Sequence, residues 1–524
     1  MASHFSRTAA ADGPARQQGI GASSGSSKGS TYREILRSTA VIAGSTAVNI
    51  GIGIVRTKVM AVLLGPAGFG LMGAFTSIAD LARTAAQMGV NSSGVRQIAE
   101  AVGSGDTDRI ARTVAVLRRI TVALGMVGAL SVVLFARQVS VLTFGSDHHA
   151  TAVSLLSVAV FLRMIADSQG ALLQGMRRIG DLARIGVLGA LLGTVSSIPL
   201  VYYFRQDGVV PALIAVAAWA AITSGWYSRK VRLQPVAMTA TYMRGEILVL
   251  LRLGLAFMAS GFLTMGAAYV VRLILIRQEG LQAAGLYQAA WTLAGLYVGF
   301  VLQAMGTDFY PRLVAAAKDN LQCNRLVNEQ AHVSLLLAGT GVLATVTFAP
   351  PVLTLFYSTE FQAATEVLRW TCLGMALRVV TWPLGYILIA KGEQTLFFCA
   401  DLAWAIVNVG LSWLCVQWFG LEGAGIAFLA SYVSHLLIVY PMSRRLSGFR
   451  WSRNTFRTAV LFVLAIVAVQ LGFRAFGLPA AMALGSAATL VSAVASIHAL
   501  RGLVSQDRAG GQLARLLAPQ RRRG

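Results

Sequence analysis

Charged residues are scarce in this chain. Asp, Glu, Lys and Arg make up 12% of its 524 residues, whereas a soluble globular protein carries about 25%. Hydrophobic residues make up 56%. This composition excludes a soluble globular protein and leaves little chain for a large domain outside a bilayer. The apolar runs extend over roughly 20 residues, so they predict transmembrane helices and not the short alternating strands of a membrane barrel.

Cysteine is also rare, and metal-binding or catalytic motifs are missing. Four cysteines occur, too few and too irregularly spaced for a disulfide framework or a C-x-x-C metal site: Cys323, Cys372, Cys399 and Cys415. His148 and His149 are adjacent and do not have the spacing of helical metal ligands. Neither a G-x-x-x-x-G-K-[ST] nor an H-E-x-x-H motif is present. We therefore predict no metal, no cofactor and no enzymatic activity.

The apolar runs divide the chain into membrane spans. Fourteen are expected, at residues 39–64, 68–90, 114–136, 150–173, 185–204, 208–227, 253–276, 281–306, 333–357, 365–389, 395–418, 421–441, 458–476 and 478–500. The Gly65 to Gly68 segment is expected to form a tight turn between the first two spans. The fold class predicted is therefore an all-α polytopic membrane protein.

The net charge of +23 is explained by topology and not by nucleic-acid binding. If both termini lie on one side, that side carries 32 of the 44 Lys and Arg residues. The opposite side carries four, namely Arg137, Arg205, Arg277 and Arg474. By the positive-inside rule, both termini are predicted to be cytoplasmic.

Short similar segments in the two halves of the sequence indicate an internal repeat. Val55-Arg56 precedes Gly65 to Ala74, and Val271-Arg272 precedes the similar segment Gly280 to Ala289. A second pair of similar segments is Ile179-Gly180-Asp181 and Lys391-Gly392-Glu393. The offsets of 212 to 216 residues predict two six-helix lobes in parallel orientation, related by a pseudo-twofold axis along the membrane normal. Such an arrangement is typical of transporters, with a cleft between the lobes.

Six segments follow from this reading. They are a disordered cytoplasmic tail (1–34), an N-lobe of spans 1 to 6 (35–228), a cytoplasmic linker (229–246), a C-lobe of spans 7 to 12 (247–442), two further C-terminal spans (443–500) and a basic cytoplasmic tail (501–524).

Nine charged residues fall inside the predicted spans, where each costs roughly 2.5–3.5 kcal/mol on insertion scales. Asp80 and Arg83 are three residues apart, and Arg163 and Asp167 four, so each pair shares a helix face. These four residues are as well explained by structural ion pairs as by a functional role. Asp401 is a candidate for ion coupling, or for an ion pair with Arg378 on the neighbouring span.

The remaining deep cations give the candidate binding site. Arg56 and Arg378 have no acidic partner nearby in sequence, whereas Lys58 and Arg272 lie close enough to a span end to reach the membrane surface. Six cations against three anions inside the spans suit an anionic head group. A diphosphate fits best, because arginine binds it through paired hydrogen bonds.

Two segments resemble a known family. Residues 58–71 (KVMAVLLGPAGFGL) and 89–100 (GVNSSGVRQIAE) are similar to the first two spans of Wzx-type translocases of O-antigen and enterobacterial common antigen. These translocases form the polysaccharide transporter branch of the multidrug/oligosaccharidyl-lipid/polysaccharide (MOP) exporter superfamily. The resemblance implies two six-helix lobes, a cationic central cavity that includes Lys58, and transfer of undecaprenyl-diphosphate-linked oligosaccharide across the membrane.

The sequence hypothesis is thus a flippase of the bacterial inner membrane that works by alternating access, from the cytoplasmic to the periplasmic leaflet. Arg56, Lys58, Arg272 and Arg378 would bind the diphosphate. Expected partners are the lipid-linked glycan, membrane lipids and, further, a glycan polymerase and a chain-length regulator; nucleic acid is not expected. The alternatives are a multidrug exporter of the same superfamily, disfavoured by the cavity charge, a glycan polymerase or ligase, disfavoured by the short loops, and a scaffold for glycan assembly.

Overall fold

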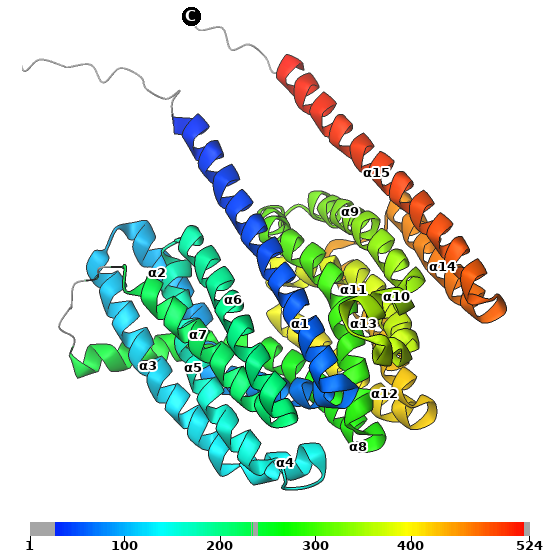
Figure 1. Ribbon diagram of the computed structural model, residues 1–524. Coiled ribbons are helices and arrows are strands. Elements are labelled where there is room, and N and C mark those ends of the chain that lie inside the picture. Colours follow the sequence, from blue (N-terminus) through cyan, green and yellow to red (C-terminus); the bar gives the residue numbers. More distant parts are fainter. Residues whose placement is uncertain (1–26, 232, 234–238, 518–524) are drawn as a thin grey trace, which may run out of the picture.

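The computed structural model describes residues 27–231, 233 and 239–517, and in that part of the chain it is built of helices alone. The predicted N-terminal tail, linker and C-terminal tail lie partly outside the described residues. Within them, α1 begins at Ser27 and α15 extends to Leu517. The ends of these two helices lie at the same end of the bundle (Figure 1).

The helices fall into three sets along the chain. The first, called here the N-half, holds α1 (Ser27–Gln87), α2 (Val90–Ser104), α3 (Thr107–Leu134), α4 (Ala136–Phe144), α5 (Ala150–Gly175), α6 (Ile179–Phe204), η1 (Arg205–Gly208) and α7 (Val209–Ser228). The second, the C-half, holds α8 (Ala240–Ala315), α9 (Asn320–Thr347), α10 (Ala349–Phe356), η2 (Thr359–Ala364), α11 (Thr365–Ala390), α12 (Gln394–Phe419) and α13 (Leu421–Ser447). The third is the terminal pair, α14 (Arg453–Ala475) and α15 (Leu478–Leu517).

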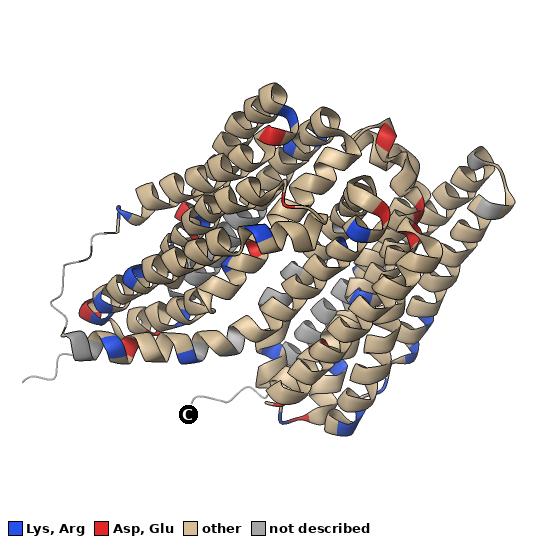
Figure 2. Ribbon diagram, turned by 90° about the horizontal axis from the view of Figure 1, so that it is seen from below, with Lys and Arg blue, Asp and Glu red and all other residues tan. Residues whose placement is uncertain are grey.

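Eleven helical stretches in the described residues are long and apolar enough to cross a membrane. Three of them, Gly44–Gln87, Ile179–Ser228 and Met258–Leu296, are 39 to 50 residues long, and each contains two of the predicted spans. If each of these three stretches crosses twice, the eleven stretches give the fourteen predicted crossings. Figure 2 shows long helical segments without charged residues. The prediction of an all-helical polytopic membrane protein is confirmed.

The expected turn between the first two spans lies at Gly65 and is confined to that one residue. The helix α1 continues through Pro66 and changes direction at Gly65 alone, where φ is 63° and ψ −179°. The helix α8 bends in the same way at Gly280, with φ 86° and ψ 176°. Positive φ in an extended conformation is open to glycine because it has no Cβ. The repeated glycine thus marks a repeated kink, and the end of the bundle where both kinks lie is called the kink end below.

The two kinked helices pack against each other through their backbones. A Cβ on Gly70 would lie 2.1 Å from the carbonyl oxygen of Leu281, and a Cβ on Gly285 would lie 1.8 Å from that of Pro66. Gly70 and Gly285 are separated by 215 residues, as are Gly65 and Gly280. Equivalent positions of the repeat therefore meet each other, as expected for residues close to a pseudo-twofold axis.

A second close contact joins the halves at the opposite end of the same helices. A Cβ on Gly89 would lie 2.0 Å from the carbonyl oxygen of Gly254, and Ser93 Oγ donates a hydrogen bond of 2.8 Å to the carbonyl of Leu250. Figure 1 shows α1 between the two groups of helices. The N-half and the C-half are thus joined at both ends of α1 and α8.

The terminal pair packs on the outer side of the C-half, against α9 (Figure 1). Phe462 of α14 contacts Gly339, where a Cβ would lie 2.7 Å from the ring. Arg369 of α11 lies over the Phe473 ring at 3.6 Å, and Gln470 Nε2 donates to Glu366 at 3.1 Å. The pair is therefore held to the C-half by specific polar and aromatic contacts.

The backbone contact between α1 and α8 can be tested by Gly70→Ala. The added methyl group would meet the Leu281 carbonyl and the backbone of Gly285, so the two helices would have to separate. Overpacking of this kind costs about 1–3 kcal/mol. We expect a lower melting temperature of the purified protein, measured in detergent by intrinsic fluorescence.

The matched control is Gly51→Ala in the same helix, because no atom lies within 4 Å of a Cβ at Gly51. That variant should melt at or slightly above the wild-type temperature, since alanine favours helix by up to about 1 kcal/mol. Equal melting temperatures for Gly70→Ala and wild type would show that the helices do not meet at Gly70.

Candidate functional site

The structure distributes the four predicted diphosphate ligands over separate places. Arg56 lies on α1 in the N-half, and Lys58 points from α1 to the C-half. Arg272 lies on α8 at the contact between the halves, and Arg378 lines a cavity inside the C-half. The four side chains therefore do not form one cluster in this conformation.

Lys58 and Arg272 are held by neutral oxygens of the protein. Lys58 Nζ donates a hydrogen bond of 2.8 Å to the carbonyl of Thr354 in α10, which joins the N-half to the C-half. Arg272 Nε donates 2.8 Å to Gln288 Oε1, across the kink of α8. Gln288 in turn lies beside Gly73 of α1. Both cations thus stabilise the junction of the halves near the kink end.

A charge network runs through the N-half. Arg83 Nη1 lies 2.7 Å from Asp167 Oδ2, and Arg83 Nη2 lies 3.6 Å from Asp80 Oδ1. Gln87 Nε2 adds a hydrogen bond of 3.2 Å to Asp167. The network therefore joins α5 to α1.

The predicted pair of Arg163 with Asp167 is therefore wrong, although Asp80 and Arg83 do pair. Asp167 turns to Arg83 because α5 packs against the second part of α1, and a partner on a neighbouring helix satisfies the carboxylate better than one on its own helix surface. Arg163 is exposed and has no acidic partner within 4.0 Å among the described residues.

Arg56 and Arg163 both lie in membrane spans of the N-half, on α1 and α5, which pack against each other. Arg56 is partly buried and Arg163 is exposed. In the described part of the chain, no carboxylate lies within 4.0 Å of either guanidinium group. An anion bound to either arginine would supply the missing counter-charge.

Arg378 lies in a cavity of about 240 Å³ enclosed by α8, α11, α12 and α13. Asp401 lines the same cavity, but within the described residues no ion pair under 4.0 Å joins it to Arg378. The expected ion pair between the neighbouring spans is thus not formed in this conformation, and the role of Asp401 in ion coupling stays a prediction.

The aromatic walls of this cavity were missed by sequence reasoning. Three tryptophans and three tyrosines from four helices line it, together with one phenylalanine: Trp291, Trp382, Trp404, Tyr287, Tyr386, Tyr432 and Phe397. Each lies in an apolar span, where an aromatic residue is unremarkable. The packing of the helices brings them together, and spacing along one helix gives no signal for that.

Among the described residues, no group of three or more His, Cys, Asp or Glu side chains is placed to hold a metal ion. His148 and His149 lie in the turn before α5, where the His149 ring packs 4.5 Å from that of Phe144. The contacts of His149 are therefore those of a packed aromatic ring.

The ion pair between Arg83 and Asp167 gives a prediction for stability. Asp167→Asn should lower the melting temperature, because it leaves a partly buried arginine with Asp80 alone. Loss of such a pair costs about 1–3 kcal/mol, between the values for surface and fully buried pairs. The measurement is thermal unfolding in detergent.

Glu100→Gln provides the control, because it breaks the Arg96 to Glu100 ion pair of similar length whose side chains are about half exposed. That change should have little effect, since exposed pairs contribute about 0–1 kcal/mol. If Asp167→Asn were no more harmful than Glu100→Gln, the network would not stabilise the N-half.

Comparison with known proteins places the chain in a family. A family model described as polysaccharide biosynthesis protein matches residues 59–366, which is more than half of the chain. The chain is 24% identical over 401 residues to the lipid III flippases of Escherichia coli strain K12 and Shigella flexneri, covering 75% of this chain and 94% of theirs.

Solved structures share the fold. A multidrug resistance MATE family transporter of the MOP superfamily, in its inward-facing conformation, superposes with a TM-score of 0.63 at 16% identity, covering 76% of this chain and 94% of that one. The lipid II flippase MurJ, in an inward closed conformation, gives 0.62 at 13% identity, covering 88% and 99%. The chain therefore belongs to the polysaccharide biosynthesis protein family, and it shares the fold of these transporters.

Proposed function

We propose that this protein is a flippase that moves a polyprenyl-diphosphate-linked oligosaccharide from the cytoplasmic to the periplasmic leaflet of a bacterial inner membrane. The family supports transport in polysaccharide biosynthesis, and relatives at 24% identity are named lipid III flippases. The observation that carries the proposal is that Arg56 and Arg163 both lie in membrane spans of the N-half and that, among the described residues, neither has a carboxylate within 4.0 Å.

The positive charge of these two arginines favours an anionic ligand over a cationic drug. Two guanidinium groups bind a diphosphate through charge-assisted hydrogen bonds, each contributing about 1.5–3 kcal/mol. A cationic substrate would be repelled at the same place. We therefore assign the diphosphate to Arg56, as the sequence suggested. We add Arg163, for which the sequence left an ion pair and a functional role equally open.

Lys58 and Arg272 have a different part in this proposal. Both now donate to protein oxygens, at Thr354 and Gln288, and would contact the diphosphate only in a conformation in which the halves have moved. Alternating access requires such a rearrangement, because the contacts at one end of α1 and α8 must open while those at the other end hold. In this scheme both termini are cytoplasmic, on the side with most Lys and Arg.

The test is leaflet exposure of a labelled undecaprenyl-diphosphate oligosaccharide in proteoliposomes. Wild type should move the lipid, and the variants Arg56→Gln and Arg163→Gln should each move it at least about tenfold more slowly, because each loses a charge-assisted contact. The control is Arg137→Gln, an exposed arginine whose only described ion pair is with exposed Asp147.

Transport at the wild-type rate by both arginine variants would refute the assignment of the diphosphate. A wild-type protein that moved no lipid but extended the glycan would replace the flippase with a polymerase.

A further inference from the structure

The cavity in the C-half has features that a diphosphate site does not need. Its volume of about 240 Å³ corresponds to roughly eight water molecules at about 30 Å³ each, too large for a bare ion. It is smaller than the roughly 300–1,000 Å³ of pockets for drug-sized molecules. One ring-sized polar ligand is what this space accommodates.

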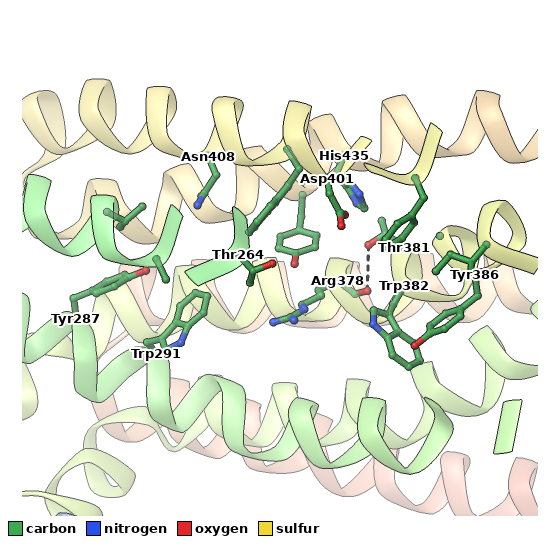
Figure 3. A pocket seen from close by; sticks show the side chains of 17 residues that line it. Thr264, Tyr287, Trp291, Arg378, Thr381, Trp382, Tyr386, Asp401, Asn408 and His435 are labelled. Carbon is green, nitrogen blue, oxygen red and sulfur yellow. Dashed lines mark hydrogen bonds between the residues drawn. The ribbon is translucent and has the colours of Figure 1, made fainter. Parts of the chain in front are cut away.

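Aromatic rings form its walls in fixed orientations. Trp382 packs edge to face on Tyr386 with ring centroids 4.5 Å apart, and Trp404 lies 5.7 Å from Tyr432. On the other side, Trp291 packs edge to face on Phe428 at 4.9 Å. Figure 3 shows Trp291 and Trp382 on two sides of the cavity. Rings held by such contacts provide flat, rigid surfaces for an apolar ligand face.

The polar groups in the cavity include both donors and acceptors. Figure 3 shows Arg378, Asp401 and Thr264 directed toward its middle, with Asn408 further along α12. Arg378 donates only, the Asp401 carboxylate accepts only, and the Asn408 amide does both. Since Arg378 and Asp401 bring one charge of each sign, the cavity does not favour an ion of either sign.

Part of this hydrogen-bonding capacity is unused. Within the described residues, Trp404 Nε1 and His435 Nδ1 are buried without a hydrogen-bond partner. Buried polar groups in native proteins nearly always have one, so each such group requires an explanation. A ligand with several hydroxyl groups would supply partners to this wall directly or through water.

One wall of the cavity is formed by α8, the C-half helix that packs on α1. Thr264, which belongs to this wall, is exposed. The cavity therefore adjoins the helix that makes the junction with the N-half.

We propose that this cavity is a sugar subsite, in which one pyranose ring of the lipid-linked glycan stacks on Trp382 and binds Arg378, Asp401 and Asn408 through its hydroxyl groups. A pyranose has flat faces of C–H groups and a rim of hydroxyls, and so matches aromatic walls with mixed donors and acceptors. This inference rests on the proposed function, since it names the second recognition site of the same substrate. It assigns Arg378 to the glycan and leaves the diphosphate to Arg56 and Arg163.

The experiment compares two lipids in detergent: undecaprenyl diphosphate bearing a trisaccharide of hexosamines, and bare undecaprenyl diphosphate. Dissociation constants are measured by microscale thermophoresis for wild type, Trp382→Leu and Trp382→Phe. Wild type should bind the glycosylated lipid about three- to tenfold more tightly than the bare one, as expected for one stacked ring. Trp382→Leu should abolish this difference without changing the affinity for the bare lipid, and Trp382→Phe should preserve most of it.

Other outcomes separate the possible failures. Equal binding of both lipids by wild type, or equal weakening of both by Trp382→Leu, would overturn the sugar subsite while leaving the flippase intact. Binding of neither lipid by wild type would overturn the proposed function and the subsite with it. Arg56→Gln serves as the reference, because it should weaken both lipids alike. Melting temperatures confirm that each variant is folded.

Discussion

The arrangement of this protein depends on how each charge at bilayer depth is satisfied. A charged side chain there costs roughly 2.5–3.5 kcal/mol on insertion scales, so a partner oxygen within the protein is strongly favoured. Arg83 reaches Asp167, and Lys58 reaches a backbone carbonyl of α10. These contacts join helices that are distant in sequence. Among the described residues, Arg56, Arg163 and Arg378 have no carboxylate within 4.0 Å and are consequently the deep arginines available to a ligand.

The two halves share a scaffold and differ in chemistry. Gly65 and Gly280 bend equivalent helices in the same way, and Gly70 and Gly285 meet where the helices cross. The N-half carries two arginines without a carboxylate partner and an ion-pair network, whereas the C-half encloses an aromatic cavity. Two halves of similar fold but different side-chain chemistry suit the proposed substrate, which has a charged head group at one end and a neutral glycan at the other.

The spans and the internal repeat could be predicted well from the sequence, because both depend on local sequence signals. Apolar runs gave the spans, and the recurrence of Gly65 as Gly280 gave the repeat that the structure shows as two equivalent kinks. The partners of the charged side chains were harder to predict. Asp167 pairs with Arg83, 84 residues away, and not with Arg163 on its own helix. Such choices depend on which helix faces pack together, and hydropathy does not determine them. The six lobe and tail boundaries stay predictions.

The contacts between the halves explain how a transport cycle of the proposed kind could be driven by its substrate. Gly65 and Gly89 flank the second part of α1 at opposite ends and are 24 residues apart, about 36 Å at 1.5 Å per residue. At the kink end, the only hydrogen bond described between α1 and α10 is that of Lys58 with Thr354; at the other end, Ser93 makes one with Leu250. Each such bond contributes a few kcal/mol at most.

A diphosphate that exchanged the Thr354 carbonyl for its own oxygens at Lys58 would compensate for the broken contact. Because a ligand shifts a conformational equilibrium only by its difference in affinity for the two states, this exchange supplies a physical basis for that difference. Opening the junction then requires the contacts at one end to break, while the close contact of Gly89 with Gly254 at the other end keeps the two halves aligned.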